Sequence, residues 1–249
     1  MGAAQDAPLA RRLLGLLDLT SLNDADDGPV IQALSRQAAT AAGRVAALCT
    51  WARLVPSAVQ ALDGTGVPVA AVANFPGGAP DVQASALECR QAVADGAREV
   101  DVVFPWRAFL GGDRDTPVTL VQACRRACGP QTLLKVILET GALGSPAQIR
   151  AAADLAIACG ADFLKTSTGR LQPGATLPAA QVMLDALAQA QARGIRVGFK
   201  ASGGIRTMAE AASYVALYEG RFGVGSAGPA VFRIGASQLV RELLSVANA

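Results

Sequence analysis

The three lysines of this chain are its most informative residues. The sequence has only three lysines against 19 arginines, and each lies in a short apolar run, at residues 132–138, 162–166 and 196–201. Lysine is normally a surface residue, because burying an unpaired ammonium group is costly. Lysine can also lose its proton and attack a carbonyl carbon, whereas arginine stays protonated. Lys135, Lys165 and Lys200 therefore indicate positions that require an amine. The alternative is that a biased, Ala- and Arg-rich composition leaves few lysines by chance.

Lys165 and Lys200 are expected to place two amines at one site. If both point into one barrel mouth, their like charges and their burial disfavour protonation, and the pKa of one of them falls toward neutrality. A neutral lysine amine can form a Schiff base with a carbonyl compound. Asp101, expected on the same rim, can then move protons directly or through a water molecule. The alternative for Asp101 is that it only neutralises a lysine, and spacing alone favours neither interpretation.

Three segments that follow predicted strands indicate a phosphate site. They are Thr166-Ser-Thr-Gly169-Arg170, Ser202-Gly-Gly-Ile-Arg206 and Gly235-Ala-Ser237. Glycines let backbone N–H groups approach an anion, and barrel phosphate sites often follow strands 7 and 8. Cys49 ends the second predicted strand and is expected to line the same pocket. Because no histidine is present to activate it, we do not expect a catalytic thiolate.

Short Val/Ile/Leu runs alternate with longer Ala-rich segments of helical period, which predicts a parallel sheet built from βα units. The predicted strands are residues 16–19, 45–50, 67–73, 99–103, 132–138, 162–166, 196–201 and 231–234. The predicted helices include residues 29–41, 81–95, 118–127, 147–158, 178–192 and 208–218. Eight strands in 249 residues without a linker predict one (β/α)8 TIM-barrel domain over residues 1–249, with a short N-terminal helical segment.

Composition excludes several classes of function. The net charge is +2 with interspersed signs, so we expect no nucleic-acid partner, and no apolar stretch approaches membrane-spanning length. We therefore expect a cytoplasmic protein. Histidine is absent and the five cysteines are scattered, which removes His-dependent catalysis and the usual zinc sites. Residues 223–228 match a dinucleotide pattern by letter, but they follow a helix rather than a strand, and a loop is the better interpretation.

Five segments, in the right order, resemble the 2-deoxy-D-ribose-5-phosphate aldolase family of class I aldolases. They are Leu17-Asp-Leu-Thr-Ser-Leu-Asn-Asp24, Glu99-Val-Asp-Val-Val-Phe-Pro105, Leu134-Lys-Val-Ile-Leu-Glu-Thr-Gly141, Phe163-Leu-Lys-Thr-Ser-Thr-Gly169 and Gly198-Phe-Lys-Ala-Ser-Gly-Gly-Ile-Arg206. The resemblance covers about residues 14–244. It implies reversible cleavage of 2-deoxy-D-ribose 5-phosphate to acetaldehyde and D-glyceraldehyde 3-phosphate, with these aldehydes and the sugar phosphate as partners.

The resemblance also implies roles for single residues. Lys165 matches the Schiff-base lysine, Lys200 the lysine that lowers its pKa, and Asp101 the proton-relaying carboxylate. Lys135 and Asp18 match supporting members of that network. The substrate-binding candidates are Thr20, Cys49, Thr166, Thr168, Gly169, Arg170, Gly203, Gly204, Arg206, Gly235 and Ser237. The imine nitrogen is the electron sink, so no metal or other cofactor is expected.

Two departures from the family pattern concern phosphate and proton transfer. Some members carry Lys in place of Arg170 and Ser in place of Gln238, so the phosphate contacts are expected to be rearranged. Some end in a tyrosine that assists proton transfer, whereas the last tyrosine here is Tyr218, so that step is expected either to be performed by water and Asp101 or to run more slowly. A Schiff-base aldolase for another sugar and a non-catalytic sugar-phosphate-binding barrel remain alternatives, and a homodimer stays open as the assembly.

Overall fold

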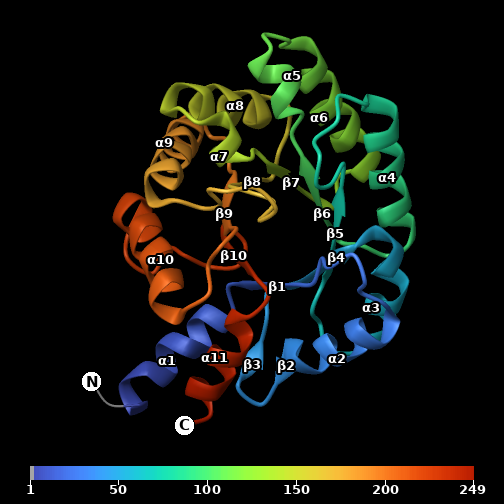
Figure 1. The fold of residues 1–249 in the computed structure, drawn as a ribbon. Coiled ribbons are helices and arrows are strands. Elements are labelled where there is room, and N and C mark those ends of the chain that lie inside the picture. Colours follow the sequence, from blue (N-terminus) through green and yellow to red (C-terminus); the bar gives the residue numbers. More distant parts are fainter. Residues whose placement is uncertain (1–2) are drawn as a thin grey trace.

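Eight parallel strands close into a barrel at the centre of the computed structural model, which describes residues 3–249 and the side chains from residue 6 onward (Figure 1). The barrel strands are β1 (Leu17–Thr20), β4 (Ala47–Trp51), β5 (Val69–Ala73), β6 (Glu99–Val103), β7 (Leu133–Ile137), β8 (Phe163–Lys165), β9 (Gly198–Ser202) and β10 (Phe232–Ala236). They neighbour one another in the order β1-β10-β9-β8-β7-β6-β5-β4, with β4 beside β1. The predicted (β/α)8 fold is confirmed, and each predicted strand overlaps one barrel strand.

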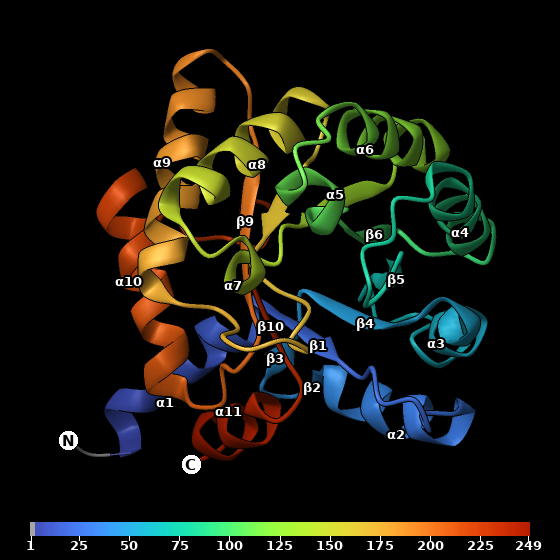
Figure 2. The same cartoon turned by 45° about the horizontal axis from the view of Figure 1, so that its top comes forward.

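Helices surround the barrel and cover the outward faces of its strands (Figures 1 and 2). They are α1 (Ala3–Leu14), α2 (Gly28–Ala38), the 3₁₀ turn η1 (Ala52–Leu54), α3 (Val55–Ala61), α4 (Val82–Ala94), α5 (Trp106–Leu110), α6 (Asp115–Cys128), α7 (Thr140–Leu143), α8 (Pro146–Ala158), α9 (Leu177–Ala192), α10 (Met208–Phe222) and α11 (Leu239–Ala247). Five of them begin after a capping side chain that accepts a backbone N–H, namely Asp27, Asp81, Ser145, Thr176 and Thr207. The predicted N-terminal helical segment is α1.

Some predicted helix ends were wrong: the helix expected over residues 208–218 continues to Phe222, and the one expected from residue 118 begins at Asp115. Residues 29–41 were expected to be helical, but α2 ends at Ala38 and the chain turns into a two-stranded antiparallel hairpin, β2 (Ala39–Thr40) with β3 (Gly43–Arg44). Gly43 has a φ of 134°, which other residues rarely adopt. The Ala-rich pattern does not distinguish the last helical turn from this hairpin. The loop expected at residues 223–228 is present between α10 and β10.

The interior of this barrel is charged. Side chains alternate between the two faces of a strand, and barrel interiors are usually filled by branched apolar residues. Here the apolar core lies mainly between the strands and the helices, while six of the eight strands contribute seven buried charged residues: Asp18, Glu99, Asp101, Lys135, Lys165, Lys200 and Arg233. None of the described helices is long and apolar enough to cross a membrane.

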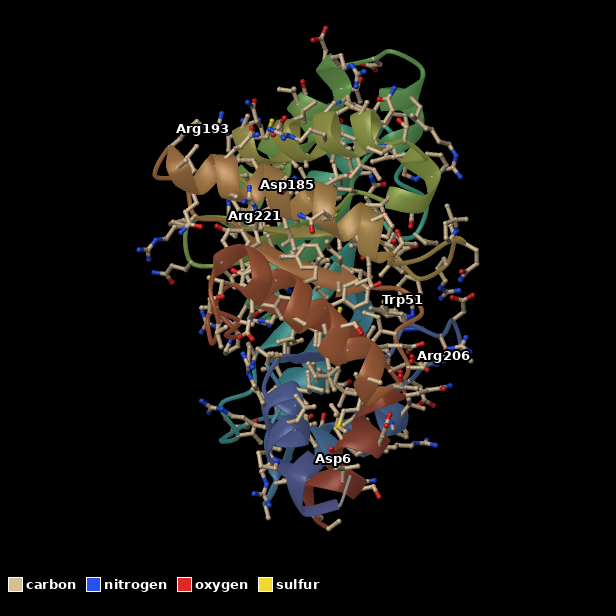
Figure 3. All side chains as sticks on the ribbon, turned by 90° about the vertical axis from the view of Figure 1, so that its left-hand side faces the viewer. Asp6, Trp51, Asp185, Arg193, Arg206 and Arg221 are labelled. Carbon is tan, nitrogen blue, oxygen red and sulfur yellow. The ribbon has the colours of Figure 1, made fainter. Side chains whose placement is uncertain are left out.

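The two ends of the barrel differ in what they carry. Figure 3 shows Arg206 and Trp51 at the end where the strands finish, and Arg193 at the opposite end, after α9. The segment between β8 and α9 lies in front of the barrel centre in Figures 1 and 2. The active site of a (β/α)8 barrel lies at the carboxyl ends of its strands, so we expect the site at the end that carries Trp51 and Arg206.

Candidate active site

Strand register brings the predicted catalytic residues together. Asp101 of β6 is paired in register with Lys135 of β7, and Lys165 of β8 is paired with Lys200 of β9. All four side chains are buried. Residues at equal height on neighbouring strands have side chains close enough to interact. The convergence expected from the sequence for Asp101, Lys165 and Lys200 is therefore present, and Lys135 joins it.

Asp101 lies at the centre of the three lysines. Its Oδ2 is 2.9 Å from Lys165 Nζ and 2.8 Å from Lys200 Nζ, and its Oδ1 is 2.8 Å from Lys135 Nζ. Cys49 Sγ also approaches Oδ2, at 4.0 Å. One carboxylate thus contacts every lysine in the chain.

A second layer of charge lies deeper in the barrel. Glu99 precedes Asp101 by two residues on β6 and so points into the same interior. Arg233 of β10 donates to Asp18 Oδ1 at 2.6 Å and to Glu99 Oε1 at 2.9 Å. Asp18 Oδ2 is 2.5 Å from Lys200 Nζ, and Glu99 Oε2 is 2.5 Å from Lys135 Nζ. We call these seven residues, Asp18, Glu99, Asp101, Lys135, Lys165, Lys200 and Arg233, the lysine–carboxylate cluster.

The lysines differ in how many carboxylates they contact. Within 4 Å, Lys135 contacts Asp18, Glu99 and Asp101. Lys200 contacts Asp18 and Asp101, whereas Lys165 contacts only Asp101. The amines thus have three, two and one anionic neighbours.

These contacts decide the protonation of each group. Burial opposes the charge of Lys135 and Lys200, but the surrounding carboxylates outweigh it and raise the pKa of both. Burial also lowers the pKa of Lys165, and there Asp101 does not compensate fully, while Lys200 lowers it further. Burial alone would raise the pKa of Asp101, yet the three lysines hold it well below its usual range. Among the three lysines, Lys165 is therefore the one whose pKa is lowered.

A polar cavity of about 400 Å³ opens at the carboxyl end of the strands. We call it the rim pocket; its lining residues are Thr20, Ser21, Leu22, Asn23, Thr168, Gly169, Arg170, Gln172, Ser202, Gly203, Gly204, Ile205, Arg206, Gly235, Ala236, Ser237 and Gln238. Nine of the eleven predicted substrate-binding residues are among them. The lysine–carboxylate cluster lies below this lining, with Lys165 only 1% exposed.

Glycines shape the floor and wall of the rim pocket. Gly203 and Gly204 have φ of 103° and 92°, and a Cβ on Gly203 would lie 3.2 Å from Gly174 Cα. Gly235 faces the cluster instead: a Cβ there would lie 2.9 Å from Lys200 Cε and 2.8 Å from Ser202 Oγ. These positions need glycine because other residues would strain the backbone or displace Lys200.

Two predicted substrate-binding residues lie outside the pocket lining. The hydroxyl of Thr166 donates to Ser202 O at 2.8 Å and accepts from Ser202 N at 2.9 Å, so it joins β8 to β9. Cys49 is fully buried beside Asp101, and burial together with that carboxylate raises the pKa of its thiol. Both residues stay candidates for supporting the site from beneath.

The sequence analysis missed Arg233, Glu99 and Glu139. Glu139 follows β7 with a φ of 58° and accepts hydrogen bonds from the hydroxyl of Thr168 at 2.5 Å and from its N–H at 3.3 Å. Burial raises the pKa of this carboxyl group. Glu139 thereby holds the segment that carries Gly169 and Arg170 into the rim pocket.

The carboxylates of the cluster are already matched by cations. Ammonium and guanidinium groups occupy the oxygens of Asp18, Glu99 and Asp101. Within the described part of the chain, no group of three or more Cys, Asp or Glu residues is arranged to hold a metal ion. The chemistry of this arrangement is that of an amine with an adjacent acid–base group.

Comparison with known proteins agrees with this geometry. A solved structure from Toxoplasma gondii ME49, provisionally named a deoxyribose-phosphate aldolase, superposes with a TM-score of 0.91 at 26% identity over 99% of this chain and 96% of that one. A protein of the same provisional name from Coccidioides immitis gives 0.81 at 31% identity over 95% and 87%. A tetrameric deoxyribose phosphate aldolase from Aeropyrum pernix, at 23% identity over 98% and 94% with a TM-score of 0.76, shares the fold. The model of the DeoC/LacD aldolase family matches residues 12–233. This chain therefore belongs to the DeoC/LacD family of aldolases and is a lyase of that kind.

Proposed function

We propose that the protein reversibly cleaves 2-deoxy-D-ribose 5-phosphate to acetaldehyde and D-glyceraldehyde 3-phosphate through a Schiff base on Lys165. The observation that carries the proposal is the unequal environment of the lysines. Lys165 alone has a lowered pKa and a single carboxylate neighbour, so it is the amine that can attack a carbonyl. The resemblance to proteins named deoxyribose-phosphate aldolases supports the choice of substrate.

The cleavage begins with attack of the neutral Lys165 amine on the aldehyde carbon of the open-chain sugar. The hydroxyl group of the carbinolamine takes up a proton and leaves as water, which gives a protonated imine. Removal of the proton from the C3 hydroxyl then breaks the C2–C3 bond, releases D-glyceraldehyde 3-phosphate and leaves an enamine. Protonation of the enamine carbon and hydrolysis of the imine release acetaldehyde and restore the amine.

Asp101 and Lys200 are positioned to serve the proton transfers of this sequence. Asp101 Oδ2 is within hydrogen-bond distance of both Lys165 and Lys200, so it can accept a proton near the forming imine and pass it on. Lys200 stays protonated, because its pKa is raised, and its charge favours the neutral form of Lys165. This assigns Asp101 a proton-moving role in addition to neutralising lysines.

The rim pocket is the proposed site of the phosphate and hydroxyl groups. Gly203 and Gly204 follow β9 with a backbone open to an anion, Arg206 lies beside them, and Ser237 precedes the first turn of α11. Backbone N–H groups and a helix N-terminus favour phosphate. Arg170 is less available, since its guanidinium is already hydrogen-bonded to Leu22 O and Asp24.

Reductive trapping tests the proposed chemistry. The protein is incubated with acetaldehyde, reduced with borohydride, digested and mapped by mass spectrometry. We expect an ethyl adduct on Lys165 and none on Lys135 or Lys200. An adduct elsewhere, or none at all, would overturn the assignment. Rates with 2-deoxyribose 5-phosphate, unphosphorylated 2-deoxyribose and other phosphorylated sugars separate the proposed substrate from the alternatives.

A further inference from the structure

Arg233 and Glu99 form a buried ion pair directly beneath the reacting lysines. The two residues are 5% and 3% exposed, and both come from barrel strands that also border the site, β10 and β6. The Schiff-base chemistry proposed above uses neither of them. A buried ion pair does not by itself indicate stability, because apolar residues of similar size often stabilise as well. Their position therefore calls for another explanation.

The contacts of this pair lead into the catalytic layer. The guanidinium of Arg233 donates hydrogen bonds to Asp18 Oδ1 and Glu99 Oε1, with N–O distances of 2.6 and 2.9 Å. Asp18 then contacts Lys200 and Glu99 contacts Lys135, each at 2.5 Å. Any change of charge in the pair is thus transmitted to Lys200 and Lys135, two of the three lysines that surround Asp101.

The cluster would be electrically neutral if it lost one proton. With every group ionised, three lysines and one arginine face three carboxylates, which leaves one uncompensated positive charge. A buried group of charges is most favourable when it is neutral. The proton that leaves comes from the lysine with the fewest carboxylate contacts, which is Lys165.

We propose that Arg233 and Glu99 are positioning residues that fix the number of protons held by the lysine–carboxylate cluster, so that Lys165 is the single lysine left unprotonated. The proposal rests on the Schiff-base function proposed above. Without Arg233 the fully protonated cluster would already be neutral, and Lys165 would keep its proton. Without Glu99 the cluster would carry two excess positive charges, and Lys165 would lose its proton more easily.

Other groups also face Lys165 and are common to every variant below. They are Asp101 on β6, Lys200 on β9, Cys49 on β4 and Glu139 after β7. Arg233 and Glu99 act on Lys165 through the cluster. Removing a unit charge within about 10 Å, at an effective dielectric constant of about 20, displaces a pKa by about one unit.

The test compares Arg233→Met and Glu99→Gln, which remove opposite charges with little change in shape. The measurement is kcat/KM for 2-deoxy-D-ribose 5-phosphate cleavage as a function of pH. We expect the acid limb to move up by about one pH unit in Arg233→Met and down by about one unit in Glu99→Gln. The double variant, which restores the single excess charge, should return the limb close to the wild-type position. Arg233→Lys, which keeps the charge without the guanidinium fork, should stay there too.

Opposite shifts separate charge control from a structural role. The proposal is overturned if the acid limb of the kcat/KM profile stays in place, or moves in the same direction in both single variants, even if activity falls. Thermal melts confirm folding, and the charge-balanced double variant keeps the test valid if a single variant unfolds. Acetaldehyde trapping on the wild-type protein is run alongside. No adduct on wild-type Lys165 would refute the proposed function, whereas an adduct with unmoved limbs would refute only this inference.

Discussion

The lysine–carboxylate cluster and the rim pocket differ in what holds their residues in place. The cluster sits on adjacent barrel strands, where register fixes the height of each side chain, and all seven of its members are buried. The rim pocket is built from the segments after those strands and is lined by exposed residues such as Arg170 and Arg206. The buried charges are thus fixed by the strands of the barrel, whereas most of the rim-pocket lining depends on the segments that follow them.

This difference predicts two kinds of mutational effect. A change in the cluster alters charges that water cannot screen, so it should affect kcat, pH dependence and stability together. A change at the rim removes one contact to a group that is partly solvated, so it should act mainly on KM.

Lys165→Arg should give the largest loss. Arginine keeps the positive charge but cannot form a Schiff base, so kcat should fall by about a thousand-fold or more, and the acetaldehyde adduct should disappear. Lys165→Met tests whether the bulk of the guanidinium contributes to that loss. Near-wild-type turnover in either variant would remove Lys165 from the mechanism.

Asp101→Asn should rank second and affect both activity and stability. The variant leaves three lysines without their shared carboxylate, so we expect kcat to fall about 100- to 1,000-fold and the free energy of unfolding by about 3–5 kcal/mol. The control is Asp185→Asn on α9, whose exposed pair with Arg221 (Figure 3) should contribute less than about 1 kcal/mol. Equal effects of the two changes would mean that burial of the cluster does not matter.

Acid should destabilise the fold through the cluster. The ion pairs hold the pKa of Asp18 and Asp101 below the unfolded value, so these groups stabilise the protein above about pH 4. That stabilisation, a few kcal/mol, should be lost as the pH falls below about 4, where the unfolded chain takes up protons first. Urea unfolding at a series of pH values measures it. Asp18→Asn should flatten the curve, and an unchanged slope would contradict the ion-pair account.

Arg206→Met tests whether the rim pocket contributes to substrate binding. Losing a charge-assisted contact to phosphate should raise KM for 2-deoxy-D-ribose 5-phosphate about 10- to 100-fold with little change in kcat. Unphosphorylated 2-deoxyribose should be affected far less. Arg193→Met, at the opposite end of the barrel in Figure 3, is the matched control and should change neither constant. Equal effects on both sugars would place the phosphate elsewhere.

Cys49→Ala should have the smallest effect, although its thiol lies beside Asp101. Its raised pKa keeps the thiol protonated, so it contributes packing and a weak hydrogen bond. We expect kcat to fall less than about five-fold and stability by about 1–2 kcal/mol. A loss comparable to that of Asp101→Asn would assign Cys49 a chemical role.

The predicted part of the site is the part that strand geometry determines. Runs of β-forming residues and the glycines before them place Asp101, Lys165 and Lys200 at one end of the barrel. Lys135 stands out as the third lysine in an apolar run, and the family resemblance gives it a supporting role and adds Asp18. Glu99 and Arg233 carry a signal of the same kind, because each is a charged residue inside an apolar strand. The sequence pattern does not show that these two charges face the lysines, because that depends on which strands lie opposite one another in the closed barrel.

The remaining residues depend on loop conformation, which the sequence does not encode locally. Glu139 reaches Thr168 only because its backbone adopts a φ of 58°. Thr166, Ser167 and Thr168 are similar by composition, yet Thr166 bonds to Ser202 while Thr168 lines the pocket. The end of α2 at Ala38 likewise follows from pairing with Gly43–Arg44, a contact between strands rather than a helical propensity.

The missing side chain of Gly235 limits how this enzyme could evolve. A Cβ there would lie 2.8 Å from Ser202 Oγ and 2.9 Å from Lys200 Cε, so any side chain at this position would require the side chains of Lys200 and Ser202 to move. A change of binding specificity is therefore accommodated more readily on the loops after the strands than at Gly235, whose position is tied to that of Lys200.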